Sequence, residues 1–136
     1  MATRMLVSVA AAAGVALSAC QTLSSAAGGS CNAHECHVKV TVTDCNISLD
    51  PDPIGIFAKN VEIHWDIVGG NATFTQNGIV IKDDAQGEFD RGHLAEQDRK
   101  FIVHDKNTFP KTYKYIVSVK QGSVACRPLD PSIANN

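Results

Sequence analysis

Apolar and polar residues alternate along several short stretches of the chain, which is the pattern of half-buried β-strands. The alternation is strictest in residues 38–43, 61–67 and 113–119. Shorter extended segments are predicted at residues 47–49 and 100–104. The pattern contains no convincing helix, so the secondary structure is expected to consist of strands and turns.

Turn residues separate these segments and suggest how they connect. Asn77-Gly78 predicts a hairpin that joins residues 72–75 to residues 78–82, since these two residue types readily adopt the positive φ angles of a tight turn. Two Asp-Pro pairs at residues 50–53 make the segment before them an edge or crossing strand. Residues 84–98 are charged and contain two glycines, so we expect a long surface connection there.

Short strands at regular spacing with intervening turn signals are typical of an all-β fold. We expect a single antiparallel β-sandwich of about 6–8 short strands. Once the N-terminal segments discussed next are set aside, about 105 residues remain, which is enough for one domain with one hydrophobic core.

The first nineteen residues have the features of a signal peptide. Arg4 precedes an uncharged run, residues 5–19, that is shorter than the roughly 20 residues needed to span a membrane. The run leads into Leu17-Ser18-Ala19-Cys20, which resembles the lipobox of bacterial lipoproteins. The resemblance implies cleavage before Cys20 and acylation of this residue, for instance by palmitate. Cleavage without lipidation and a retained core helix remain the alternatives.

Residues 20–30 are mostly small and polar, so we expect a flexible tether between the lipid and a domain formed by residues 31–136. Gln21 stands where the inner-membrane retention signal of such lipoproteins has an Asp. The resemblance therefore favours a lipid-anchored position in the cell envelope, on the periplasmic face of the outer membrane rather than at the inner membrane.

The charge of the chain limits the classes of partner. The 136 residues contain 12 basic and 14 acidic side chains, and removing residues 1–19 takes away only Arg4, which leaves 11 − 14 = −3. A chain with this mild negative charge and no basic patch is not expected to bind nucleic acid. The expected partners are the membrane, through the lipid, and an unknown envelope protein or small ligand.

Four cysteines remain besides Cys20, and an even number in an exported chain predicts two disulfide bonds. They are Cys31, Cys36, Cys45 and Cys126, for which three connectivities are possible. A bridge from the N-terminal cluster to Cys126 would close a loop of roughly 80–95 residues and contribute about 4–5 kcal/mol in the chain-entropy model.

Three segments carry a resemblance to a fold family. Residues 49–54 (LDPDPI) and 61–65 (VEIHW) resemble the opening strands of cupredoxin-like domains, and residues 112–115 (TYKY) resemble their Tyr-x-Tyr strand. Immunoglobulin-like sandwiches show similar patterns. The first resemblance implies a copper site of two His, one Cys and a Met beyond that strand. Cys126 is followed by Arg-Pro-Leu-Asp-Pro without a His, so we expect a copper-free domain.

The densest group of metal-binding residue types lies in residues 31–37 (CNAHECH). Cys31, His34, Cys36 and His37 offer thiolate and imidazole ligands that suit zinc or copper. In an oxidising compartment the cysteines would instead form disulfides and leave the two histidines exposed. Metal or small-ligand binding at this cluster is therefore the alternative function.

A histidine between two carboxylates suggests a possible general base. Glu62, His64 and Asp66 alternate with apolar residues, so they share one face of the predicted strand. The sequence shows no serine in a constrained turn and no phosphate-binding glycine spacing. A solvated sheet face explains the row equally well. The sequence thus predicts a lipid-anchored binding or structural module and not an enzyme, with no catalytic residue and no cofactor.

Overall fold

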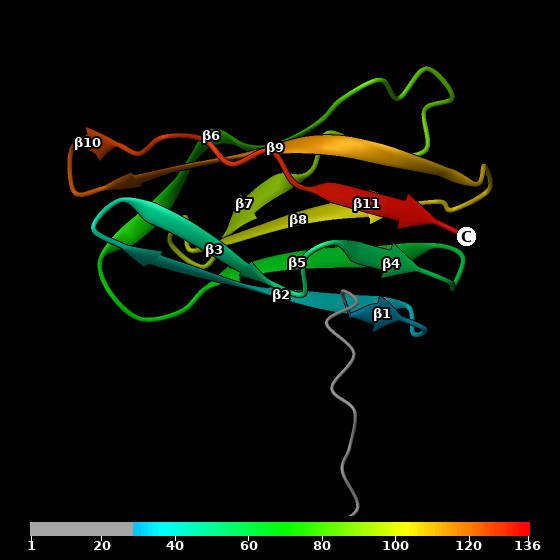
Figure 1. Cartoon of the computed structure of the whole chain (residues 1–136), viewed down its shortest axis with the longest axis horizontal. Coiled ribbons are helices and arrows are strands. Elements are labelled where there is room, and N and C mark those ends of the chain that lie inside the picture. Colours follow the sequence, from blue (N-terminus) through cyan, green and yellow to red (C-terminus); the bar gives the residue numbers. More distant parts are fainter. Residues whose placement is uncertain (1–28) are drawn as a thin grey trace, which may run out of the picture.

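The computed structural model describes residues 29–136, which form an all-β structure with no helix within that range. The predicted all-β class is confirmed. The expected signal peptide (1–19), Cys20 and most of the tether lie outside the described residues. The strands (Figure 1) are β1 Ser30–Cys31, β2 Glu35–Thr43, β3 Asn46–Asp50, β4 Ile54–Ile56, β5 Val61–Ile67, β6 Ala72–Ile81, β7 His93–Ala95, β8 Lys100–Asp105, β9 Lys111–Gln121, β10 Val124–Ala125 and β11 Ser132–Asn135.

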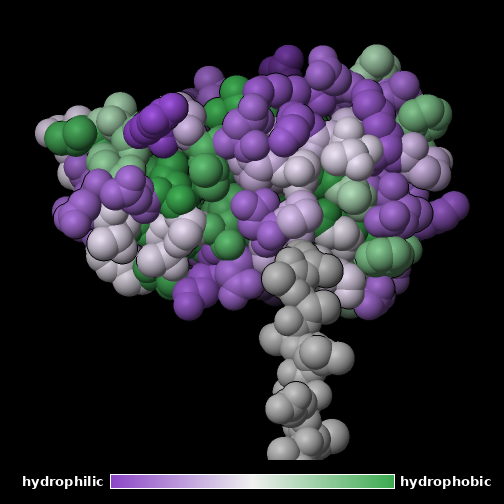
Figure 2. Space-filling model, in the orientation of Figure 1, coloured by the Kyte–Doolittle hydropathy of each residue, from purple (hydrophilic) through white to green (hydrophobic). Residues whose placement is uncertain are grey.

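The strands form two sheets. One sheet has the order β1-β4-β11-β9-β10, with β6 on the other side of β9, and the second has the order β3-β2-β5-β8-β7. In Figure 1 strands of the two sheets overlap in the view, and Figure 2 shows hydrophilic and hydrophobic side chains mixed over the same face of the molecule. Apolar side chains from both form one buried cluster. In its middle the Trp65 indole lies against Tyr115, with ring centroids 5.5 Å apart and the indole N–H donating to the phenol oxygen at 3.4 Å.

The expectation of purely antiparallel pairing is wrong. β2 and β5 run parallel, and β4 runs parallel to both β1 and β11. The reason is the path of the chain, which leaves the second sheet after β3 to form β4 in the first sheet and then returns as β5. A crossover of this kind joins parallel strands, whereas a hairpin joins antiparallel ones. The number of strands also exceeds the expected 6–8 because five of the eleven contain only two to four residues.

The hairpin predicted at Asn77-Gly78 is also wrong. These residues lie inside the single strand β6, at a register shift against β9 between Phe74 and Ile79. A Cβ at Gly78 would lie 2.7 Å from that of Phe74, so the close approach of the backbone to this ring requires glycine. The Asn-Gly pair therefore forms a bulge rather than a turn.

Two disulfide bonds staple the structure, Cys31–Cys36 and Cys45–Cys126. The predicted disulfides are thus present, and the connectivity that the sequence left open is resolved. The second bond is the long-range one, with a sequence separation of 81 residues. It joins the turn between β2 and β3 to the segment after β10, and so links the two sheets covalently.

Residues 84–98 are more than a surface connection, because they contain β7 and a buried carboxylate. Glu88 is 3% exposed and accepts hydrogen bonds from the backbone and hydroxyl of Thr108 and from the backbone of Phe109. Burial alone would raise the pKa of Glu88, but these hydrogen bonds outweigh it and lower the pKa.

Asp105, at the end of β8, is the second buried carboxylate. Its Oδ1 accepts hydrogen bonds from the Asn107 backbone at 2.9 Å and the Asn135 side chain at 3.1 Å. Its Oδ2 has no hydrogen-bond partner within residues 29–136. Burial raises the pKa of Asp105 from 3.8 to about 6, with a smaller contribution from the negative charge of Glu88.

Candidate metal centre

The parallel pairing of β2 with β5 brings two rows of polar side chains together. In this register Glu35 lies opposite Glu62, and His37 lies opposite His64. Within β2 these residues alternate with the buried Cys36 and Val38, so the polar row lies on the outer face of the sheet. The strand alternation that builds the core therefore also builds a cluster of ionisable groups on its outside.

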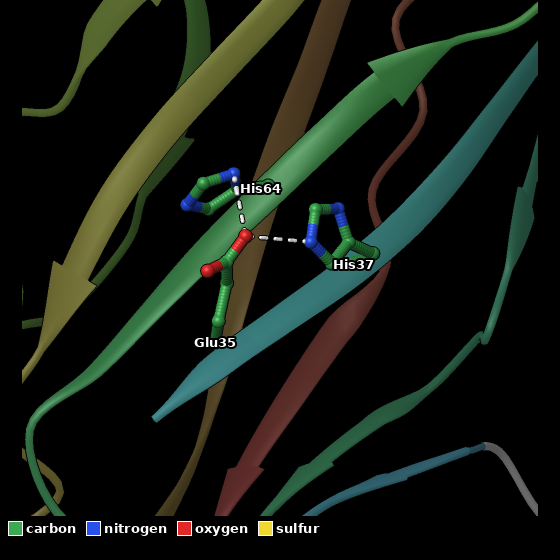
Figure 3. Close-up of side chains that lie close together, drawn as sticks. All are labelled: Glu35, His37 and His64. Atoms are coloured by element: carbon green, nitrogen blue, oxygen red, sulfur yellow. Dashed lines mark hydrogen bonds and ion pairs between the residues drawn. The ribbon is translucent and has the colours of Figure 1, made fainter. Parts of the chain in front are cut away.

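Glu35, His37 and His64 converge at one point of this face (Figure 3). The Glu35 Oε1 atom lies 2.8 Å from His37 Nε2 and 3.7 Å from His64 Nδ1. One ligand atom from each of the three side chains lies within 4.8 Å of the other two. Two ring nitrogens and one carboxylate oxygen thus face a common centre.

The outward nitrogen of each imidazole is held by a further carboxylate. His37 Nδ1 lies 2.8 Å from Asp66 Oδ2, and His64 Nε2 lies 3.3 Å from Glu62 Oε2. A carboxylate at this position takes the ring N–H and leaves the other nitrogen with a free lone pair. In both histidines the nitrogen with the free lone pair is the one that faces Glu35.

The environments of the two histidines differ. His64 is 8% exposed, and its Nδ1 has no hydrogen-bond partner within the described part of the chain. His37 is exposed to solvent. The hydrogen bond to Asp66 raises the pKa of His37; partial burial opposes this and the contact with Glu35 adds to it. Without a metal, a protonated His37 would be stabilised between the two carboxylates.

Two imidazoles and one carboxylate form a ligand set used by zinc, and imidazole also suits copper. Two ligands of a tetrahedral zinc ion lie roughly 3.4 Å apart, since each bond is about 2.0–2.1 Å long. The separations here extend to 4.8 Å, so a small rotation of the exposed Glu35 and His37 side chains would bring the donors to bonding distance. A fourth position would remain open on the solvent side.

The structure places the sequence-predicted ligands in three different settings. His37 belongs to the cluster, whereas Cys31 and Cys36 are bonded to each other and do not offer thiolates. His34 lies apart, with its Nδ1 3.4 Å from the backbone oxygen of Asn60. The other two ligand atoms come from Glu35, which lies within residues 31–37 without being one of the predicted ligands, and from His64, which the sequence places in a polar row on its own strand.

Two acidic residues of the loop before β7 accept hydrogen bonds from backbone N–H groups. Both carboxylate oxygens of Asp84 accept N–H groups, from Glu88 at 2.8 Å and Phe89 at 3.0 Å. Asp90 Oδ1 accepts the N–H groups of Gly92 and His104, each at 2.9 Å. Asp84 thus stabilises the loop itself, and Asp90 joins the loop to β8.

No protein-family model matches the sequence, and a search of curated proteins finds no match. Within residues 29–136 no helix is long and apolar enough to cross a membrane.

Proposed function

We propose that this chain is a lipid-anchored module of the cell envelope that binds a divalent transition-metal ion at Glu35, His37 and His64. One observation carries the metal-binding part of the proposal. Each of the two imidazoles has a carboxylate on its outward nitrogen and directs its other nitrogen toward Glu35. Zinc is the ion that best suits this set of ligands.

The burial of His64 supports metal binding over a simple surface ion-pair network. Its Nδ1 lies in a buried position without a hydrogen-bond partner in residues 29–136, and an unsatisfied buried nitrogen is unfavourable. A protonated His37 would donate hydrogen bonds to Glu35 and Asp66 but would leave His64 Nδ1 without a partner. A metal ion would bond to His64 Nδ1 and His37 Nε2 together and would displace the proton from His37.

Zinc titration of the purified, disulfide-bonded protein tests the site. Isothermal titration calorimetry should show one Zn²⁺ per chain, and His64→Ala and His37→Ala should each weaken binding at least tenfold. Asp66→Asn should weaken it about tenfold, since partners of this kind contribute 10- to 100-fold to metal affinity. Substoichiometric binding by the unaltered protein would overturn the proposal.

His34→Ala provides the matched control, because this histidine lies in the same N-terminal segment but outside the cluster. We expect its zinc affinity to equal that of the unaltered protein. A loss as large as that of His64→Ala would instead point to the site expected from residues 31–37. Circular dichroism of each variant separates a lost ligand from a lost fold.

We further propose that the two sheets form a β-sandwich of the cupredoxin-like or immunoglobulin-like kind. The shared core of the two sheets and the Trp65–Tyr115 contact support this. The metal centre would then differ from the copper site of cupredoxins in place and chemistry. Cys126, at the position suggested for a copper ligand, is bonded to Cys45, and the proposed centre lies on the outer face of β2 and β5. The proposed role is binding, without catalysis.

The anchoring rests on residues 17–20 and has its own test. Expression of the full chain in a bacterium that processes lipoproteins should place it in the membrane fraction, with a mass that includes acyl chains. Cys20→Ala should release it to the soluble periplasmic fraction and remove the added mass. An unchanged mass and distribution for Cys20→Ala would refute lipidation. Separation of the two membranes would test the outer-membrane position expected from Gln21.

A further inference from the structure

A cavity of about 590 Å³ opens between the two sheets at their free edges, on strands β6 and β7. β6 pairs only with β9 and β7 pairs only with β8, so within residues 29–136 neither strand has a neighbour on its outer side. The cavity lies where β6 loses its register, and Gln76 and Asn77 of the bulge form part of its lining. Its volume is typical of sites that bind small organic molecules.

The cavity has an apolar floor. Ile79 from β6 and Phe101 and Val103 from β8 are buried beneath it, and the half-buried Phe89 and Leu94 lie at its sides. These side chains come from both sheets, so the floor is part of the common core. An apolar or aromatic ligand body would be desolvated here.

A glycine keeps part of this space open. Gly92 lines the cavity with a φ of +65°, and a Cβ at this position would lie 2.6 Å from Phe101 Cε1 and 2.7 Å from Val103 Cγ2. Any other residue would therefore both strain the backbone and press on the floor. Glycine at position 92 thus allows the loop before β7 to lie directly against β8 at the edge of the cavity.

The polar side chains at the rim of the cavity differ in whether they already make hydrogen bonds within the protein. Asp84 and Asp90 already accept two backbone N–H groups each. The side chains of Arg91 and His93 are exposed, and neither side chain makes a hydrogen bond or ion pair with another group of residues 29–136. The groups at the rim without such a bond include the Arg91 guanidinium, which is suited to bidentate contact with a carboxylate, the His93 imidazole and one carboxylate oxygen, Asp90 Oδ2.

From the apolar floor and the free donors above it, we infer that this cavity binds a small amphipathic carboxylate. The apolar body lies on Ile79, Phe101 and Leu94, and the carboxylate contacts Arg91, with His93 beside it. The site is separate from the metal centre, which lies on the outer face of β2 and β5, and it does not depend on the metal-binding proposal.

Three naphthalene compounds of matched shape test the head group: 2-naphthylacetate, 2-(2-naphthyl)ethanol and 2-(2-naphthyl)ethylammonium. Titrations of the full-length protein, followed by naphthalene fluorescence and by backbone amide NMR shifts, should show the acid binding about tenfold more tightly than the alcohol. The amide shifts should concentrate in residues 76–81 and 91–94. Equal affinities, a preference for the ammonium compound, or shifts elsewhere would overturn the inference.

Arg91→Gln should abolish the preference for the acid and leave binding of the alcohol unchanged, because the substitution lies on the exposed rim. Leu94→Asn should weaken all three compounds together. His37→Ala serves as the control for the metal centre and should leave all three affinities unchanged. If the protein binds naphthylacetate but not zinc, only the metal-binding proposal is refuted. If it binds zinc but not naphthylacetate, only the carboxylate-binding inference is refuted.

Discussion

Replacing Cys45 and Cys126 together with Ala should lower the free energy of unfolding by about 4–5 kcal/mol. The bond between them closes a loop with a sequence separation of 81 residues. Without the bond the unfolded chain gains entropy, and in the chain-entropy model this gain lowers the free energy of the unfolded state by about 4–5 kcal/mol at 25 °C. Small domains have a net stability of about 5–15 kcal/mol. The double variant should therefore unfold at a much lower urea concentration or fail to fold at 37 °C.

The second disulfide supplies a matched control within the same molecule. Cys31 and Cys36 are separated by only 5 residues, so their replacement by Ala should cost about 2 kcal/mol by the same reasoning. Urea unfolding of both double variants, monitored by Trp65 fluorescence, gives the comparison. Equal losses, or a larger loss for the short loop, would show that loop entropy is not the main contribution of the Cys45–Cys126 bond.

Asp105→Asn should make the protein more stable at pH 8, by at most about 3 kcal/mol. Burial raises the pKa of Asp105 to about 6 in the folded protein, compared with 3.8 for an ordinary carboxyl. The folded state therefore binds the proton more tightly between these values, so the contribution of Asp105 to stability falls as the pH rises from about 4 to about 6. A shift of this size corresponds to roughly 3 kcal/mol.

The measurement is the difference in unfolding free energy between the unaltered protein and Asp105→Asn at pH 4, 5, 6, 7 and 8. This difference should be small at pH 4, grow between pH 4 and pH 7, and level off above. Glu88, which is buried nearby with a lowered pKa, titrates in both proteins and cancels in the comparison to first order. Asp83→Asn removes the same charge from an exposed position and serves as the matched control. A difference independent of pH for Asp105→Asn would contradict the assignment.

The strands in which every second side chain is buried could be predicted from the sequence, whereas β6, whose alternation is interrupted by its bulge, could not be predicted as one strand. Residues 61–67, for example, coincide with β5, in which Val61, Ile63, Trp65 and Ile67 are buried. β1, β4, β7, β10 and β11 were not predicted. With two to four residues each, they are too short to show a two-residue period, and tertiary pairing rather than local pattern makes them strands.

The candidate metal centre could be predicted only in part, for a related reason. The row Glu62, His64 and Asp66 was visible along one strand, and His37 was visible in the segment before it. Only the parallel register of β2 and β5 places His37 opposite His64, and nothing local in either strand specifies that register. The density of Cys and His in residues 31–37 instead predicts two thiolate ligands, Cys31 and Cys36, but these two sulfurs form a disulfide.

The central place of β11 in its sheet has a consequence for the order in which the protein acquires its structure. β4 and β9 are both synthesised earlier, but they meet only through residues 132–135, which pair with one strand on each side. Until those residues have left the ribosome, the sheet exists as two separate parts with open edges. Such edges readily pair with other chains, so a polypeptide interrupted before Ser132 is expected to aggregate.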